Sequence, residues 1–125
     1  MAKILIADDS DIVREQVKSG LAAFGHEIVE ATDGQAALEL MIQQRDIEIA
    51  IVDVNMPRMD GLAFVKAMLA TDGLQQVTII MQTTETSQTL RLTAKEMGIR
   101  YWAIKPVDAK LLHATIAHIM KKSGK

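Results

Sequence analysis

Acidic, hydroxyl and amine side chains stand at the ends of short apolar runs in this sequence, where their types and spacing could do chemistry. Asp8 and Asp9 follow the first run, Asp53 ends the third, and Thr83 and Lys105 follow the fourth and fifth. Three carboxylates brought close together would repel one another by on the order of 1 kcal/mol per pair. They need a proton, the Lys105 amine, or a hard divalent cation such as Mg²⁺ or Mn²⁺. We expect the cation and the lysine together.

These residues could together transfer a phosphoryl group. With a cation anchored by Asp8 and Asp9, the free oxygen of Asp53 becomes an in-line nucleophile for a phosphoryl group. The Lys105 amine and the Thr83 hydroxyl are placed to hold the phosphoryl oxygens, and the product would be an acyl phosphate on Asp53. Asp8 has a simpler alternative role, because a carboxylate at this position can also cap the following helix. Asp9 is the better direct metal ligand.

Five β-branched runs must position these side chains. They span residues 3–7, 27–30, 48–53, 77–82 and 100–104, and they alternate with longer segments whose apolar residues recur at helical spacing. The first and third runs are apolar on both faces, as central strands of a helix-covered parallel sheet are. The alternation predicts an α/β sandwich. In such sheets ligands bind beyond the carboxyl ends of the strands, where the candidate residues stand.

The helical segments carry apolar stripes that would each cover one face of the sheet. The stripes consist of Val13, Val17, Leu21 and Phe24, of Leu62, Val65 and Leu69, and of Leu112, Ile116 and Ile119. Ser10 and Asp11 offer capping oxygens to the first helix. Gly25 and Gly98 are expected where the first and fourth helices stop.

Other polar residues have plainer expected roles. Asp60-Gly61 is typical of a helix start and a turn rather than of catalysis. Pro106 restricts the backbone of Lys105 and can take a cis bond, which would fix where the amine points. The histidines are expected at the surface or rim, without a catalytic role: His26, His113 and His118.

Length and composition exclude several classes of protein. The 125 residues suffice for one domain, which we place at residues 1–121, with a disordered tail over 122–125. A net charge of −2, from 14 basic and 16 acidic side chains, attracts neither nucleic acid nor anionic lipid. No apolar run is long enough to insert into a membrane. The absence of cysteine excludes disulfides and thiolate chemistry, and the cytoplasm is the expected location.

The order of these motifs resembles the receiver domains of two-component response regulators, most closely the single-domain chemotaxis receivers of the CheY type. The resemblance covers nearly the whole chain and rests on Asp8-Asp9, on Asp53 followed by Met56-Pro57 and Asp60-Gly61, on Thr83, and on Lys105-Pro106. It implies a flavodoxin-like, doubly wound fold with five parallel strands in the order 2-1-3-4-5 and five flanking helices. It also implies a phosphoacceptor signalling protein, which catalyses only its own phosphotransfer and dephosphorylation.

The resemblance further implies a metal site and a phosphodonor. Asp53 would accept phosphate from the phosphohistidine of a histidine kinase or a phosphotransfer protein. Mg²⁺, with Mn²⁺ as a substitute, would be bound by Asp8, Asp9, Asp53 and the backbone carbonyl of Asn55. The side chains of Thr83 and Lys105 would bind the phosphoryl group.

Three residues are expected to tune how long the phosphate lasts. Asn55 and Glu85 stand two residues after the acceptor and two after the threonine, where the resemblance implies that they flank the path of a hydrolytic water. Both residues resemble the pair in chemotaxis receivers, which predicts a comparatively short-lived acyl phosphate. Thr84 could partly block that water.

Phosphorylation would switch a protein-binding face. It adds about −1.5 to −2 charge, which should draw Thr83 and the lysine inward. In receivers of this kind an aromatic side chain three residues before the lysine then turns inward, and here Trp102 stands where tyrosine or phenylalanine is usual. The segment 86–97 predicts a marginal helix suited to move, because its apolar stripe is thin and it holds three threonines. With the last strand and helix it would offer Arg91, Lys95 and Trp102 to a downstream target protein.

Other functions compete with this interpretation. A haloacid dehalogenase-like phosphatase needs a second aspartate two residues after the nucleophile, where this chain has Asn55. A flavin carrier would need a glycine-rich loop where Asp8-Asp9 stands. The stronger alternative is a non-phosphorylated pseudo-receiver that acts only as an interaction module. The favoured hypothesis is a chemotaxis-type response regulator, expected as a monomer or as a phosphorylation-dependent dimer, although no motif encodes the pathway.

Overall fold

Strands and helices alternate along the chain as the sequence pattern predicts. A computed structural model describes residues 2–84 and 87–122. Within these ranges the elements are β1 (Lys3–Ala7), α1 (Asp11–Ala22), β2 (Glu27–Ala31), α2 (Gly34–Gln43), β3 (Ile49–Asp53), α3 (Gly61–Leu69), β4 (Thr78–Thr83), α4 (Gln88–Glu96), β5 (Tyr101–Ile104) and α5 (Ala109–Lys122). Each predicted strand agrees with the observed one to within one residue at either end.

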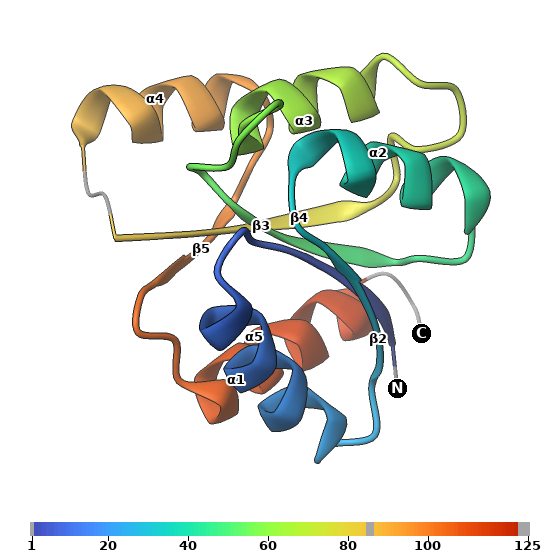
Figure 1. The fold of residues 1–125 in the computed structure, drawn as a ribbon, viewed down its shortest axis with the longest axis vertical. Coiled ribbons are helices and arrows are strands. Elements are labelled where there is room, and N and C mark those ends of the chain that lie inside the picture. The colour runs from blue at the N-terminus through green and yellow to red at the C-terminus, as the bar shows by residue number, and fades with distance from the viewer. Residues whose placement is uncertain (1, 85–86, 123–125) are drawn as a thin grey trace.

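The five strands form one parallel sheet in the order β2-β1-β3-β4-β5 (Figure 1). Ala7 at the end of β1 pairs with Val52 of β3, and Asp53 pairs with Gln82 of β4. The carboxyl ends of the three central strands therefore meet at one edge of the sheet. This confirms the predicted flavodoxin-like, doubly wound α/β fold.

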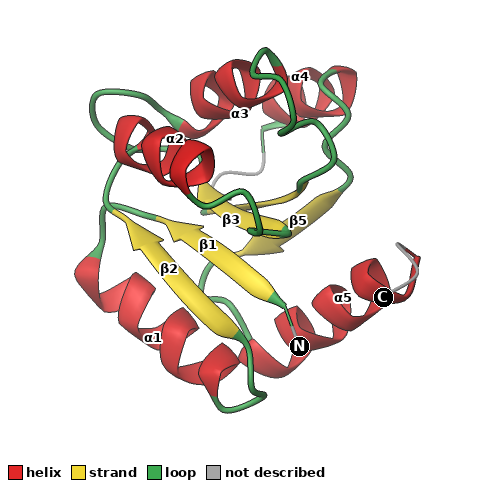
Figure 2. Ribbon diagram, turned by 90° about the vertical axis from the view of Figure 1, so that its right-hand side faces the viewer, coloured by secondary structure: helices red, strands yellow, loops and turns green. Residues whose placement is uncertain are grey.

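Helices cover both faces of the sheet (Figure 2). α1 and α5 lie on one face, and α2, α3 and α4 lie on the other. Side chains of β1 and β3 alternate between the two cores, with Ile4, Ile6, Ile49 and Ile51 toward α1 and α5 and with Leu5, Ala7, Ala50 and Val52 toward the other helices. Both strands are apolar on both faces because each face is covered.

Capping residues and glycines set the helix ends as predicted. Ser10 caps α1 by accepting a hydrogen bond from the Val13 N–H at 3.2 Å. Asp60 starts α3 in the same way, through the Ala63 N–H at 2.8 Å. Gly25 and Gly98 follow α1 and α4 with φ of +86°, a left-handed conformation that glycine adopts without strain. α4 begins at Gln88, and the predicted helix start at residue 86 lies outside the described residues.

The apolar stripe predicted for the first helix is too long. α1 ends at Ala22, so Phe24 is not part of the stripe, and its side chain is 41% exposed. Its ring stacks on His113 of α5 with centroids 3.9 Å apart. His26 was expected at the surface or rim and is buried instead, because its Nδ1 accepts from the Ala2 N–H and its Nε2 faces His113 Nδ1. The last stripe, on α5, is confirmed: Leu112, Ile116 and Ile119 are buried.

The buried face of α3 also differs from the predicted stripe. Val65 is buried as predicted, but Leu62 and Leu69 are only partly buried, and the fully buried residues are Phe64 and Met68. α3 begins at Gly61, which packs directly against the end of β3, and Leu62 and Leu69 pack at the edge of the core.

The predicted domain boundary lies near the end of the last helix. The expected domain boundary at residue 121 falls one residue before the end of α5. Residues 123–125 of the expected tail lie outside the described residues. Across residues 2–84 and 87–122, no helix combines the length and apolar character needed to cross a membrane.

Candidate functional site

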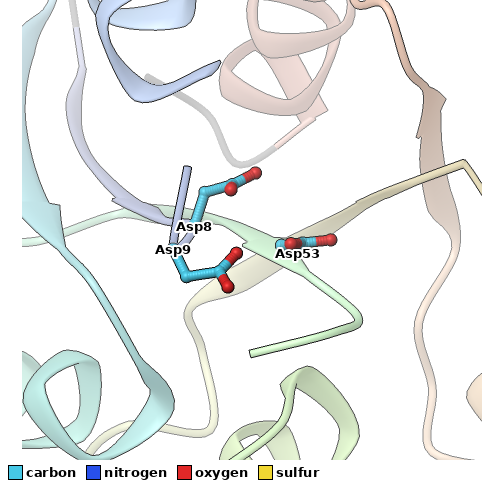
Figure 3. A group of neighbouring side chains, drawn as sticks. All are labelled: Asp8, Asp9 and Asp53. Atoms are coloured by element: carbon cyan, nitrogen blue, oxygen red, sulfur yellow. The ribbon is translucent and has the colours of Figure 1, made fainter. Parts of the chain in front are cut away.

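The ends of β1 and β3 bring three carboxylates together (Figure 3). Asp8 and Asp9 follow β1, and Asp53 is the last residue of β3. One carboxylate oxygen from each residue lies within 4.8 Å of the other two. Asp8 and Asp53 are only 0% and 5% exposed, whereas Asp9 is exposed to solvent. The predicted acidic cluster thus has two buried members and one open member.

Lys105 lies between the two buried carboxylates. Its Nζ is 2.7 Å from Asp8 Oδ2 and 3.3 Å from Asp53 Oδ2. Its backbone N–H donates to the Thr83 carbonyl at 3.0 Å, and the peptide bond to Pro106 is cis, as the sequence allowed. Lys105 contacts Asp8 and Asp53 but not Asp9, so within the described part of the cluster one ammonium charge stands against three carboxylates and two negative charges remain uncompensated.

Burial and charge shift the pKa values of the two residues that would do the chemistry. Burial raises the pKa of Asp53, and the charge of Asp8 adds to this effect, while Lys105 partly opposes it. For Lys105, burial alone would lower the pKa of the amine. The carboxylates of Asp8 and Asp53 outweigh burial, so the net pKa of Lys105 is raised. Lys105 therefore remains a cation at neutral pH.

Asp8 is held by three hydrogen-bond donors. Its Oδ1 accepts from the Ser10 N–H at 2.9 Å, and its Oδ2 accepts from Gln82 Nε2 at 2.9 Å and from Lys105. The expectation that Asp8 caps α1 is wrong, because Ser10 is the capping residue and Asp8 binds the backbone N–H of that cap. Three donors compensate the burial of this carboxylate.

Gln82 is the site residue that the sequence interpretation missed. It is fully buried and stands opposite Asp53 in the register of β3 and β4. Paired residues of neighbouring strands point to the same face of a sheet, so Gln82 faces the same side as Asp53. A signal was present in the sequence, because Gln82 is a polar residue directly after the apolar residues 79–81.

The loop between β3 and α3 is fixed against the site. A Cβ on Gly61 would collide with the Asp53 carbonyl oxygen, so glycine lets α3 start this close. The Asn55 N–H lies 3.5 Å from Asp53 Oδ1. Arg58, whose φ is +65°, donates through Nε and Nη2 to Asp33 Oδ2 and so ties the loop to the start of α2. Asn55, the predicted backbone ligand, is held within this loop.

The predicted switch residues lie on β4 and β5. Thr83 is buried at the end of β4, Thr84 is exposed, and Glu85 lies outside the described residues. Trp102 is partly buried and packs toward α4, on the opposite face of β5 from Tyr101. The guanidinium carbon of Arg91 lies 5.0 Å from the centroid of the Trp102 ring.

The donor set of the acidic cluster fits a hard divalent cation. The three side chains offer carboxylate oxygens, which Mg²⁺ and Mn²⁺ prefer as ligands. The two negative charges that Lys105 leaves uncompensated equal the charge of one such ion. The exposure of Asp9 leaves one side open to solvent, as suits an ion that keeps several of its waters.

Comparisons with known proteins agree with this geometry. Residues 4–117 match the family model of the response regulator receiver domain. The chemotaxis protein CheY homolog of Campylobacter jejuni is 33% identical over 119 residues, which cover 94% of this chain and 92% of that protein. The chemotaxis protein CheY1 of Helicobacter pylori strain J99 is 35% identical over 111 residues, covering 88% and 90%.

A solved structure extends the likeness to three dimensions. Vibrio cholerae chemotaxis protein CheY4, at 37% identity, superposes with a TM-score of 0.88 and covers 95% of this chain and 98% of its own. The strand order, the acidic cluster at the carboxyl ends and the matched residues 4–117 lead to one assignment. The chain belongs to the family of response regulator receiver domains and is a CheY-like receiver.

Proposed function

We propose that Asp53 accepts a phosphoryl group from the phosphohistidine of a histidine kinase or a phosphotransfer protein. The observation that carries this proposal is the position of the Asp53 carboxylate, which lies 3.3 Å from the Lys105 ammonium and within 4.8 Å of two further carboxylates. Receiver domains are signalling modules rather than classical enzymes. The only reactions proposed for this chain are its own phosphorylation and dephosphorylation.

Each residue of the site has a separate task in the transfer. A carboxylate oxygen of Asp53 forms a bond to phosphorus while the bond from phosphorus to the donor histidine breaks, and the electron pair remains on the imidazole nitrogen. Lys105 offsets the negative charge of the phosphoryl oxygens. The Thr83 hydroxyl donates a hydrogen bond to one of them. Mg²⁺, which Asp8, Asp9, Asp53 and the Asn55 carbonyl would hold and which Mn²⁺ could replace, supplies further charge neutralisation when bound.

The phosphoryl group would change the positions of its two partners. Lys105, which contacts Asp8 and Asp53, gains strong acceptor oxygens close to the same carboxylate, and Thr83 gains an acceptor for its hydroxyl. An inward movement of Thr83 makes room for Trp102 on the neighbouring strand β5. Trp102 contacts Arg91 of α4 in this structure, so an inward turn of Trp102 would release that contact and change the surroundings of α4.

The face formed by α4, β5 and α5 is proposed as the surface that binds the downstream target. Each of these elements carries an exposed large apolar side chain, and these are Leu92, Ile104 and Leu111. Arg91 and Lys95 are exposed on α4, and the partly buried Trp102 of β5 contacts Arg91. The likeness to chemotaxis proteins of three bacteria supports a chemotaxis-type signal, and a cytoplasmic location is proposed with it.

The lifetime of the phosphate is proposed to depend on the residues around Asp53. Asn55 and Thr84 are exposed, where a hydrolytic water could approach, and Glu85 is proposed to complete this group. The combination of Asn55 and Glu85 predicts a short-lived acyl phosphate. The rate of phosphate loss from the isolated protein, without a phosphatase, measures this, and a lifetime of many hours would contradict it.

Incubation with Mg²⁺ and acetyl phosphate tests the proposed function. Mass spectrometry should detect the gain of one phosphoryl group in the native protein and no gain in Asp53→Asn. Beryllium fluoride, a mimic of the phosphoryl group, should change the fluorescence of Trp102. A native protein that neither gains mass nor responds to the mimic would instead be a pseudo-receiver.

A further inference from the structure

Gln82 has one satisfied and one unsatisfied polar atom inside the site. The side chain is fully buried, and its Nε2 donates to Asp8 Oδ2 at 2.9 Å. Among residues 2–84 and 87–122, no group forms a hydrogen bond with its Oε1. A buried acceptor without a donor costs free energy, so native proteins rarely leave one.

The orientation of the amide follows from Asp8. A carboxylate only accepts hydrogen bonds, so the nitrogen of the amide and not its oxygen must face Asp8 Oδ2. The two amide atoms share one carbon, and Oε1 therefore lies roughly 2.2 Å from Nε2. Because Nε2 is 2.9 Å from Asp8 Oδ2, the bare acceptor lies close to Asp8, one of the three carboxylates of the cluster.

Only some groups of the site could donate a hydrogen bond to Gln82 Oε1. Carboxylates and the oxygens of a phosphoryl group are acceptors and would repel Oε1. The ammonium of Lys105 contacts Asp8 and Asp53 and forms no hydrogen bond with Oε1. A water molecule coordinated to a divalent cation is a strong donor, and Mg²⁺ keeps several of its waters when it binds to carboxylates.

We propose that Gln82 is a positioning residue of the metal site. Its Nε2 fixes the carboxylate of Asp8, and its Oε1 accepts a hydrogen bond from a water in the coordination shell of the cation. The inference rests on the proposed binding of Mg²⁺ and goes beyond it, because Gln82 neither coordinates the cation nor contacts the phosphoryl group. Residues that orient ligands in this way change metal affinity by about 10- to 100-fold when they are replaced.

Magnesium binding in the absence of any phosphodonor tests this inference. Isothermal titration with MgCl₂ compares the native protein with Gln82→Met, which keeps the length of the side chain and removes both polar atoms. The expected result is a Kd for Mg²⁺ that is about tenfold higher in the variant. Gln43→Met is the matched control, because Gln43 is exposed on α2, and its Kd should equal that of the native protein.

A second measurement separates positioning from packing. Urea unfolding with and without MgCl₂ gives the stabilisation by the ion, which follows its Kd. A packing role alone would change the unfolding midpoint without Mg²⁺ and leave the shift caused by Mg²⁺ unchanged, which would overturn the inference. If Gln82→Met does not fold, Gln82→Leu replaces it. A native protein that binds no Mg²⁺ would overturn the metal part of the proposed function, whereas equal affinities of native protein and variant would overturn only the inference.

Discussion

The guanidinium carbon of Arg91 lies 5.0 Å from the centre of the Trp102 ring, so a cation on α4 rests against the aromatic side chain of β5. A contact of this kind contributes about 0.5–1 kcal/mol when it is accessible to solvent. It joins the two elements that are proposed to rearrange when Asp53 is phosphorylated. Arg91 therefore stabilises the orientation of Trp102 in the unphosphorylated protein.

Replacing Arg91 should make the protein easier to activate. If Trp102 leaves Arg91 when it turns inward, Arg91→Ala removes a contact that only the resting state makes. The concentration of beryllium fluoride that gives half of the Trp102 fluorescence change should then fall roughly two- to fivefold. Lys95→Ala, an exposed cation on the same helix, is the control and should leave the midpoint unchanged. An Arg91→Ala protein with the native midpoint would mean that the contact survives activation.

The fold could be predicted from sequence because its signals are local and repeated. The apolar residues of β1 and β3 predicted two central strands, and Gly25, Gly98 and Ser10 predicted the ends of helices. The predictions that were wrong concern residues whose burial depends on contacts between segments distant in sequence. Phe24 packs on His113 of α5, and His26 is buried by the same helix. No local pattern contains these pairs.

The candidate site was predictable where residues stand at strand ends. Asp8, Asp9, Asp53 and Lys105 were found this way, because parallel strands bring their carboxyl ends together. Gln82 was missed because its role depends on the register between β3 and β4, which sequence periodicity does not specify. The contact between Arg91 and Trp102 depends in the same way on how α4 lies over β5.

Asp53→Asn should stabilise the metal-free protein at neutral pH. The pKa of Asp53 is raised by burial and by Asp8, so the ionised carboxylate destabilises the folded state. The contribution of Asp53 to the free energy of unfolding is most favourable below its ordinary pKa of 3.8. It is lost as the pH rises through the raised pKa of the folded state. We expect the variant to gain on the order of 1 kcal/mol in unfolding free energy at pH 7.

Urea unfolding in EDTA measures this gain, and Mg²⁺ should reduce it because the cation offsets the same repulsion in the native protein. Asp72→Asn removes an exposed carboxylate from a loop and serves as the control. A loss of stability in Asp53→Asn would show that the hydrogen bonds of the carboxylate outweigh its repulsion from Asp8.

The positive φ of Arg58 should make glycine better tolerated there than alanine. Both substitutions lose the ion pair with Asp33, but alanine keeps a side chain at φ of +65° and glycine does not. We expect Arg58→Gly to be more stable than Arg58→Ala by roughly 0.5–1 kcal/mol, after allowing for the greater freedom of glycine in the unfolded chain. The same difference should persist when Asp33 is replaced by alanine, since it arises from the backbone. Equal unfolding midpoints in urea would exclude this strain.

Mild acid should destabilise the fold through His26. Its Nδ1 accepts from the Ala2 N–H at 3.1 Å, so a neutral ring carries its proton on Nε2 and donates it to His113 Nδ1 at 2.9 Å. A second proton on His26 would turn Nδ1 into a donor facing another donor. The pKa of His26 is lowered by burial first and by the charge of His113 second.

Because the pKa of His26 is lowered in the folded state, its contribution to stability is complete above the ordinary value of 6.5 and is lost as the pH falls below it. The unfolding free energy should therefore decrease between pH 7.5 and 5.5, with a slope of at most about 1.4 kcal/mol per pH unit from this group. His26→Gln retains a hydrogen-bonding side chain without a titrating ring, and it should flatten this slope. His118→Gln is the matched control, because His118 is exposed on α5 and contacts only the edge of Tyr101 among the rings of the described residues. A slope that His26→Gln leaves unchanged would assign the acid sensitivity to other groups.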